Sequence, residues 1–161
     1  MIGNTLAGKY LITSEFATDK LGTTFVAELD NGNQVLLLTL AAGVGDAGDA
    51  VQDLLAQSER AQALGNGHIV PVVASGLVSD TPYLVLPLVP GRPLREEIKS
   101  KRGLDPDRIT NIAYQIANAA AEAASVSVYH FGLSADIIYL ADAEADAVRV
   151  LRFGFSPLLP A

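Results

Sequence analysis

Cysteine and tryptophan are absent from the 161 residues, histidine occurs twice and methionine once. Without cysteine the chain has no disulfide, no thiolate metal ligand and no thiol nucleophile. The two histidines, His68 and His130, are far apart in the sequence and lack the close spacing typical of metal ligands. These absences exclude disulfide-stabilised folds and thiol-dependent enzymes, and they fit a reducing compartment.

Positive charge and long apolar runs are also scarce. The 11 basic residues are outnumbered by 18 acidic ones, which gives a formal net charge of -7. This charge repels nucleic-acid phosphates and anionic lipids, so we expect no nucleic-acid or membrane partner. No apolar run approaches the roughly 20 residues that span a bilayer, and the first ten residues lack a secretory signal. The sequence therefore predicts a cytoplasmic protein.

Apolar residues make up 50% of the chain, which is enough for a hydrophobic core. The length corresponds to about one domain of ordinary size. Charged residues make up only 18%, below the roughly 25% of an average domain. We therefore expect the surface to keep an apolar area that another molecule covers.

The first half of the chain predicts a sheet with one helix. Strand-forming residues dominate five segments: 10–17, 23–30, 34–41, 68–73 and 83–89. Asn31-Gly32 lies between two apolar runs, which predicts an antiparallel hairpin. A helix is predicted from Ala50 to Gly65, and residues 75–82 read as a turn between the last two strands.

The second half predicts helices and a short hairpin. Pro90, Gly91 and Pro93 mark the change. A short polar helix is predicted over 95–103 and a long one from Asp107 to about Ser125, with Asp105 as its N-cap. Two short strands around an acidic turn follow in 137–154. The fold class is thus α+β: a five-stranded antiparallel sheet plus one helix, then a long helix and a short β-hairpin.

This order of elements is that of a protein kinase. Over nearly its whole length the chain resembles bacterial Ser/Thr protein kinases of the eukaryotic type, through IGNTLAGKYLIT, GTTFVAEL, GHIVPVVASG, TPYLVLPLVPGRPL and VLRFG. The resemblance implies a kinase N-lobe-like subdomain over 1–90 and a truncated C-lobe-like subdomain over 91–161. Because the chain stops just beyond VLRFG, we expect either a naturally truncated pseudokinase or a piece of a longer chain.

The nucleotide-binding positions that the resemblance identifies lack kinase chemistry. The phosphate loop, residues 17–22, keeps only its last glycine, and Asp19 adds negative charge there. Leu38 stands where the third strand of a kinase carries its lysine. Gln57 stands where the following helix carries the glutamate that pairs with this lysine. We therefore expect no ion pair here.

The catalytic positions have also changed. The H-R-D-L-x-x-x-N pattern reads HFGLSADI, so Gly132 replaces the catalytic base and Ile137 replaces the metal-binding asparagine. The D-F-G triplet reads Arg152-Phe153-Gly154, with a cation in place of the Mg²⁺-binding carboxylate. The resemblance therefore implies a catalytically inactive pseudokinase with no cofactor or metal, for which ATP and Mg²⁺ are not expected ligands. We interpret His130 and Phe153 as packing residues.

The long helix carries an isoleucine stripe and an alanine stripe side by side. In a kinase, later helices cover this helix, so we expect one stripe to pack on the final hairpin and the other to stay available. The candidate partner-binding residues are Ile109, Ile112, Ala113, Ile116, Ala117 and Ala120. A symmetric dimer, a different protein partner, and sealing by the tail FGFSPLLPA are the three alternatives.

The function predicted from these observations is a protein-protein interaction or scaffold module in a bacterial signalling or assembly complex. The alternative is a nucleotide-binding pseudokinase, either a sensor or a weak phosphotransferase in which Lys20 replaces the strand lysine. A third reading is an assembly subunit that uses the kinase shape as a building block. The acidic stretches DAGDAVQD and ADAEADA are interpreted as solvated loops, or as steering charges for a basic partner.

Overall fold

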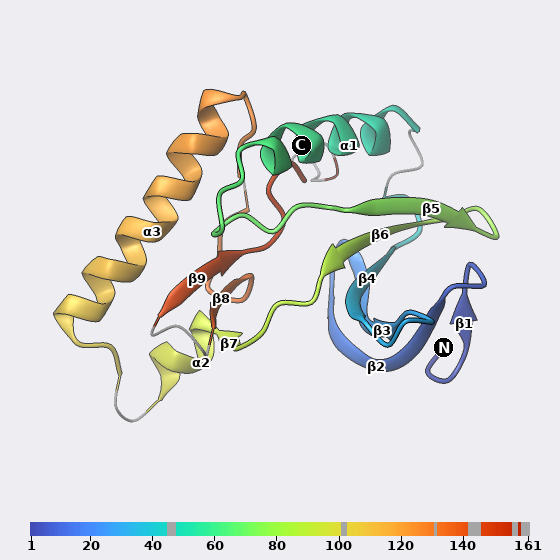
Figure 1. Cartoon of the computed structure of the whole chain (residues 1–161), viewed down its shortest axis with the longest axis horizontal. Coiled ribbons are helices and arrows are strands. Elements are labelled where there is room, and N and C mark those ends of the chain that lie inside the picture. Colours follow the sequence, from blue (N-terminus) through green and yellow to red (C-terminus); the bar gives the residue numbers. More distant parts are fainter. Residues whose placement is uncertain (45–47, 101–102, 131, 142–145, 156–157, 159–161) are drawn as a thin grey trace. The chain divides into compact units, whose positions relative to one another are not determined.

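A computed structural model of the chain describes residues 1–44, 48–100, 103–130, 132–141, 146–155 and 158 (Figure 1). The chain divides into two compact units. The first is made mainly of Met1–Leu54 and Val72–Leu88, and the second of Leu55–Pro71 and Val89–Ser156. Helix α1 (Gly48–Ala63), which confirms the predicted first helix, begins in the first unit and ends in the second. The subdomain ranges 1–90 and 91–161 stay a prediction.

The first unit is built on an antiparallel sheet with the strand order β1-β2-β3-β4-β6-β5. The predicted five-stranded antiparallel sheet is confirmed, and a two-residue strand that pairs Leu6 with Tyr10 extends it at one edge. Two residues are too few to show an alternating pattern, so no local signal indicates this strand. The strands are β1 (Thr5–Leu6), β2 (Tyr10–Asp19), β3 (Gly22–Glu28), β4 (Gln34–Leu40), β5 (Ala74–Val78) and β6 (Thr81–Pro87).

One predicted strand is wrong. Residues 68–73 form no strand, and β5 lies instead at 74–78, in a segment predicted as a turn. The backbone before β5 is engaged elsewhere, because Val70 N donates to the Val150 carbonyl and Val150 N donates to the carbonyl of His68, at 3.0 and 2.7 Å. The true turn needs only Ser79 and Asp80, whose φ angles of 47° and 64° suit a two-residue hairpin.

The predicted hairpin at Asn31-Gly32 is confirmed, with a longer loop than a two-residue turn. Glu28 pairs with Gln34, so residues 29–33 form the loop. Gly32 alone takes the left-handed conformation, with φ at 80°. Asn31 acts through its side chain, because its Oδ1 accepts a hydrogen bond from Asn33 N at 3.0 Å.

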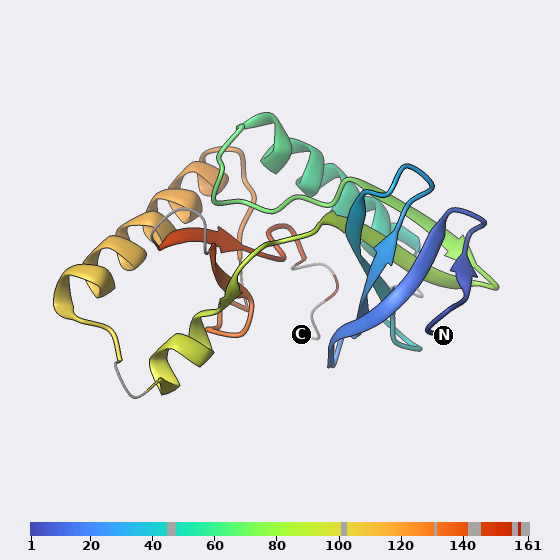
Figure 2. The same cartoon turned by 60° about the horizontal axis from the view of Figure 1, so that its bottom comes forward.

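The second unit contains the long helix and the final hairpin. The prediction of both is confirmed by α3 (Pro106–Ser125), β8 (Ile138–Ala141) and β9 (Ala147–Val150), and the short helix is α2 (Leu94–Lys99). A two-residue strand, β7 (Arg92–Pro93), completes a three-stranded sheet. Asp105 caps α3 as predicted, since its Oδ1 accepts from Arg108 N at 2.9 Å. Strand β9 runs beside α3 in both views (Figure 1, Figure 2).

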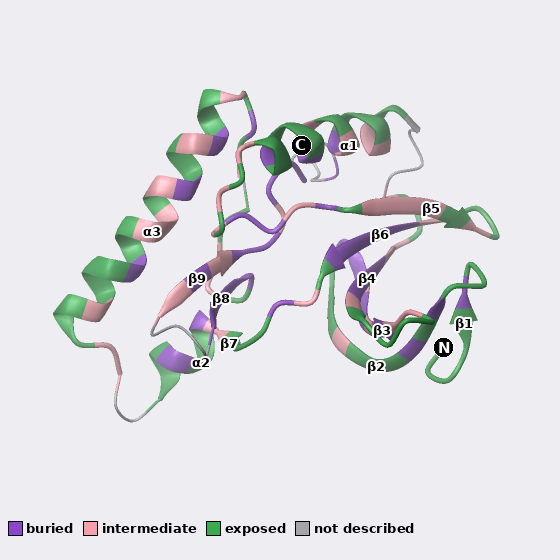
Figure 3. Ribbon diagram, in the orientation of Figure 1, coloured by how far each residue is buried: buried purple, intermediate pink, exposed green. Residues whose placement is uncertain are grey.

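Each unit has its own apolar cluster, seen as the purple segments of Figure 3. In the first unit, Tyr10 and Tyr83 meet edge to face across the sheet with ring centroids 5.9 Å apart. In the second unit, Ile112, Ala119 and Ala123 of α3 pack with residues of the final hairpin and with Phe153. No helix in the described ranges is long and apolar enough to cross a membrane.

Parts of several predicted features fall outside the described residues. These are residues 142–145 of the acidic turn, 46–47 of the stretch DAGDAVQD, 101–102 of the polar helix, 131 of the pattern HFGLSADI, and 156–157 and 159–161 of the tail.

Candidate functional site

The predicted phosphate loop, residues 17–22, includes the tip of the β2–β3 hairpin, where Lys20 and Leu21 connect the two strands. The backbone N–H of Leu21 donates to Oδ1 of Asp19 at 2.9 Å, so the chain's own carboxylate takes up this amide. The side chain of Leu21 is buried, whereas Lys20 is exposed. The retained Gly22 has a packing role, because a Cβ on it would lie 1.9 Å from the carbonyl oxygen of Thr39.

Leu38 lies in the middle of β4 and is 2% exposed. Strand alternation places Leu36 and Leu40 on the same face, and the register sets Leu84 of β6 directly opposite Leu38. All four side chains are buried. An ammonium group at this position would lose its hydration among aliphatic side chains, which is costly unless an opposite charge pairs with it.

Gln57 of α1 lies against the triplet Arg152-Phe153-Gly154, within the second unit. A Cβ on Gly154 would lie 3.0 Å from the Cβ of Gln57 and 3.5 Å from the backbone nitrogen of Ser58. The glycine therefore lets the triplet backbone approach the helix closely. The structure thus places Gln57 next to the triplet, and neither Gln57 nor Gly154 supplies a negative charge.

The triplet itself is firmly packed. Phe153 is 2% exposed and belongs to the core of the second unit. Arg152 has φ at 72°, a left-handed conformation that is uncommon outside glycine. Its guanidinium carries hydrogen-bond donors only, so it cannot ligate the cation that a carboxylate would bind at this position.

His130, in the segment after α3, contacts the triplet and the residue before it. Its Nε2 donates to the carbonyl of Leu151 at 2.8 Å, and its ring meets Phe153 edge to face with centroids 5.1 Å apart. Burial lowers the pKa of His130, and the positive charge of Arg152 adds to this effect. The ring is therefore held in its neutral form.

The two remaining degenerate positions lie in the loop that leads into β8. Gly132 is exposed, and Ile137 is buried with only an apolar side chain to offer. The neighbouring Asp136 pairs with Arg95 of α2, whose Nη2 lies 2.6 Å from its Oδ2 while Nε contacts Oδ1. The hydrogen bond from Arg95 lowers the pKa of Asp136. This carboxylate is therefore engaged in holding α2 to the loop.

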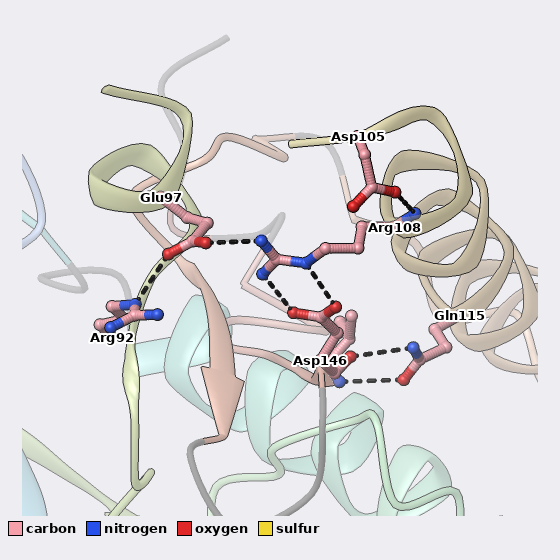
Figure 4. A network of polar contacts seen from close by, with 7 residues as sticks. Arg92, Glu97, Asp105, Arg108, Gln115 and Asp146 are labelled. Atoms are coloured by element: carbon pink, nitrogen blue, oxygen red, sulfur yellow. Dashed lines mark hydrogen bonds and ion pairs between the residues drawn. The ribbon is translucent and has the colours of Figure 1, made fainter. Parts of the chain in front are cut away.

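A polar network that the sequence did not reveal joins α2, α3 and the start of β9 (Figure 4). Arg108 donates to both carboxylate oxygens of Asp146, at 2.8 and 2.6 Å, and to Oε1 of Glu97 at 2.8 Å. Arg92 pairs with the other oxygen of Glu97 at 2.9 Å. The hydrogen bonds from Arg108 lower the pKa of both Glu97 and Asp146.

Gln115 extends this network to the backbone of the hairpin. Its Nε2 donates to the Asp146 carbonyl and its Oε1 accepts from Val148 N, both at 2.9 Å. Arg108 is 11 positions from Glu97 and 38 from Asp146, and no local motif indicates such pairs. The network stabilises the second unit, and its charged groups are engaged with one another.

The candidate partner-binding residues of α3 separate into two sets. Ile112 is 3% exposed, and Ile116 packs partly buried against the same core. Ile109 is 51% exposed, and the alanines at 113, 117 and 120 are exposed as well. From Ile109 to Ser125, every exposed residue of the helix is uncharged.

No group of three or more His, Asp or Glu side chains able to hold a metal ion occurs within the described part of the chain.

Comparison with known proteins supports the kinase-like fold. No protein-family model matches the chain. The serine/threonine-protein kinase PrkC of Bacillus subtilis (strain 168) is 26% identical over 133 residues, which cover 81% of this chain and 20% of PrkC. The probable serine/threonine-protein kinase PkwA of Thermomonospora curvata is 22% identical over 147 residues, covering 91% and 19%. The chain thus spans about a fifth of these curated relatives.

Solved structures give the same result. The crystal structure of the M. tuberculosis PknI kinase domain matches with a TM-score of 0.79 at 16% identity, over 97% of this chain and 62% of that chain. A double mutant of the same domain matches with a TM-score of 0.82, also at 16% identity, over 97% and 64%. The chain has a protein-kinase-like fold, and the predicted resemblance to bacterial Ser/Thr kinases is confirmed.

Proposed function

We propose that this kinase-like chain is a catalytically inactive pseudokinase that serves as a protein-binding or scaffold module in a bacterial cytoplasm. The observation that carries the proposal is the environment of Leu38. The position that would hold the phosphate-binding lysine is buried among Leu36, Leu40 and Leu84. A charged side chain would be costly on a sheet face packed with leucines, so this position favours an apolar residue.

The phosphate loop supports the same conclusion. A kinase closes this loop over the triphosphate through free backbone amides. Here the Leu21 amide donates to the Asp19 carboxylate. A phosphate approaching this tip would have to displace a negative charge and would be repelled by it.

The metal-binding positions do not fit Mg²⁺, which prefers oxygen ligands. Ile137, at the asparagine position, carries no side-chain oxygen, and Arg152, at the carboxylate position, carries a positive charge. We therefore expect no Mg²⁺-assisted phosphoryl transfer by this chain.

The proposed interaction surface is the exposed face of α3, made of Ile109, Ala113, Ala117 and Ala120. We propose a second copy of the chain as its occupant. The chain has a net charge of -7, and two copies repel one another least where neither surface is charged. The exposed part of α3 beyond Asp107 meets this condition, and its alanines allow two helices to approach closely.

Thermal unfolding with ATP, with and without Mg²⁺, tests the loss of nucleotide binding. A ligand at about 100 times its dissociation constant would add about 2.7 kcal/mol to the free energy of unfolding. We expect no shift of Tm under either condition. Adenosine is the matched probe, because it tests the base site without the phosphates. A Mg²⁺-dependent shift would contradict the proposal and favour the nucleotide-binding alternative.

Sedimentation equilibrium over a wide range of protein concentration tests the proposed interaction. We expect a reversible monomer–dimer equilibrium that salt does not weaken, because the face carries no charge pairs for salt to screen. A chain that stays monomeric at every concentration would overturn the second copy as occupant.

A further inference from the structure

The two histidines of the chain make similar hydrogen bonds in different surroundings. Nδ1 of His68 lies 2.9 Å from the carbonyl of Val148, and Nε2 of His130 lies 2.8 Å from the carbonyl of Leu151. Since a carbonyl only accepts, the ring nitrogen is the donor in each pair. The rings differ at the second nitrogen: Nδ1 of His130 is buried, and no described residue gives it a hydrogen-bond partner.

Protonation of His130 would place a second N–H on this buried atom. A buried positive charge without a charged partner is costly, and here burial outweighs the backbone hydrogen bonds to Leu151 and to His130 itself, which favour the charged ring. The ring is also in edge contact with Phe153, whose side chain is in the core. The packed segment therefore favours the neutral ring over the charged one.

The charged groups around the ring do not offset this cost. The charge that acts on His130 from the described residues is the guanidinium of Arg152, which disfavours a second positive charge. Phe153 and Leu151 contribute an apolar ring and a backbone carbonyl. No carboxylate in the described part of the chain acts on His130.

We propose that His130 is a proton-sensitive latch, which holds the segment 151–154 in place when neutral and releases it when protonated. The segment held in this way includes Gly154, whose backbone lies against Gln57 and Ser58 of α1. Protonation would therefore loosen the contact between the triplet and α1.

The sign of the effect follows from linkage. The pKa of His130 is lowered in the packed state, relative to about 6.5 for a free histidine. The latch is therefore closed above about pH 6.5 and weakens as pH falls below it. Between the pKa of the released ring and that of the packed ring, the opening equilibrium rises up to about tenfold for each pH unit.

Amide hydrogen exchange of residues 151–155, corrected for intrinsic rates, tests the latch at about pH 7.5 and about pH 5, on either side of the free-histidine pKa. We expect protection in this segment to fall at the lower pH. The variant His130→Gln keeps a donor for the Leu151 carbonyl and cannot titrate, so it should lose this pH dependence. The control His68→Asn should keep it, since its amide replaces Nδ1.

Equal pH dependence in the unmodified chain and in His130→Gln would overturn the proposal, and so would its loss in His68→Asn. If His130→Gln does not fold, the latch is tested by following the NMR ring resonances of His130 in the unmodified chain as pH is varied. The pKa of His130 must then lie below about 6.5, the value of a free histidine, and a pKa at or above that value would contradict the latch.

Discussion

Gly154 lies directly against Gln57, with little room for a side chain between the triplet and helix α1. A Cβ on Gly154 would be 3.0 Å from the Cβ of Gln57, and the φ angle of Gly154 is 81°. The close approach disfavours a side chain here, and the left-handed backbone conformation favours glycine. The packing between the triplet and α1 persists although the residues at these positions carry no kinase charge pair.

The first prediction concerns this contact. Gly154→Ala should destabilise the chain by about 1–3 kcal/mol, because the methyl group meets α1 and the left-handed φ is unfavourable for alanine. Chemical denaturation followed by far-ultraviolet circular dichroism measures the loss. Gly67→Ala is the control, since Gly67 has open space around its Cβ position and no positive φ. An equal effect of the two substitutions would contradict the proposed packing role of Gly154.

The second prediction concerns Leu38. Leu38→Lys restores the residue type of a kinase but places an ammonium among buried leucines. We expect a loss of about 3 kcal/mol or more in the free energy of unfolding, and no gain of ATP-dependent stabilisation. The control Leu38→Met keeps the volume and should cost less than about 1.5 kcal/mol. A stable Leu38→Lys variant that binds ATP would show that this position still accepts charge.

The sequence was sufficient to predict the elements whose signals are local. Asn31-Gly32 indicates a hairpin, and Asp105-Pro106 indicates the start of α3, because turn and cap preferences depend on neighbouring residues alone. The chemically altered positions, such as Leu38, are identified by the resemblance to bacterial Ser/Thr kinases. The structure shows where these positions lie in the fold, and their assignment to a former nucleotide site stays a prediction.

The structural features that the sequence did not predict depend on residues that are far apart in the chain. Val70 resembles a strand residue, and its amide donates to Val150, so the strand begins later than its pattern suggests. Arg108 joins Glu97 to Asp146, and such pairs are not encoded in any local spacing. The buried Nδ1 of His130 likewise follows from packing, which periodicity does not report.

The third prediction concerns the Arg108 network and its pH dependence. Arg108→Met leaves the carboxylates of Glu97 and Asp146 without their main partner, so it should lower Tm several times more than Arg95→Met, which breaks an exposed pair. In the unmodified chain, Arg108 lowers the pKa of both carboxyls. The stability they contribute is therefore present above the ordinary carboxyl pKa of about 4 and lost as pH falls through the lowered values.

Thermal melts of both variants from about pH 7 downward measure this effect. Arg108→Met should lose less stability on acidification than the unmodified chain, because protonation relieves its unpaired carboxylates. Parallel pH profiles for the two proteins would contradict the network as the origin of the acid sensitivity.

The last prediction tests the α3 surface. Ala117 is exposed in the middle of the uncharged face, so Ala117→Glu should place repelling carboxylates at the centre of a symmetric contact and shift the chain to monomer. Its free energy of unfolding at dilute concentration should stay within about 0.5 kcal/mol of that of the unmodified chain, as for other exposed helix positions. The control Asn111→Glu adds the same charge to the same helix, away from the alanine stripe, and should leave the equilibrium unchanged. If sedimentation shows both variants dissociating equally, net charge rather than this face governs association, and the proposed surface is wrong.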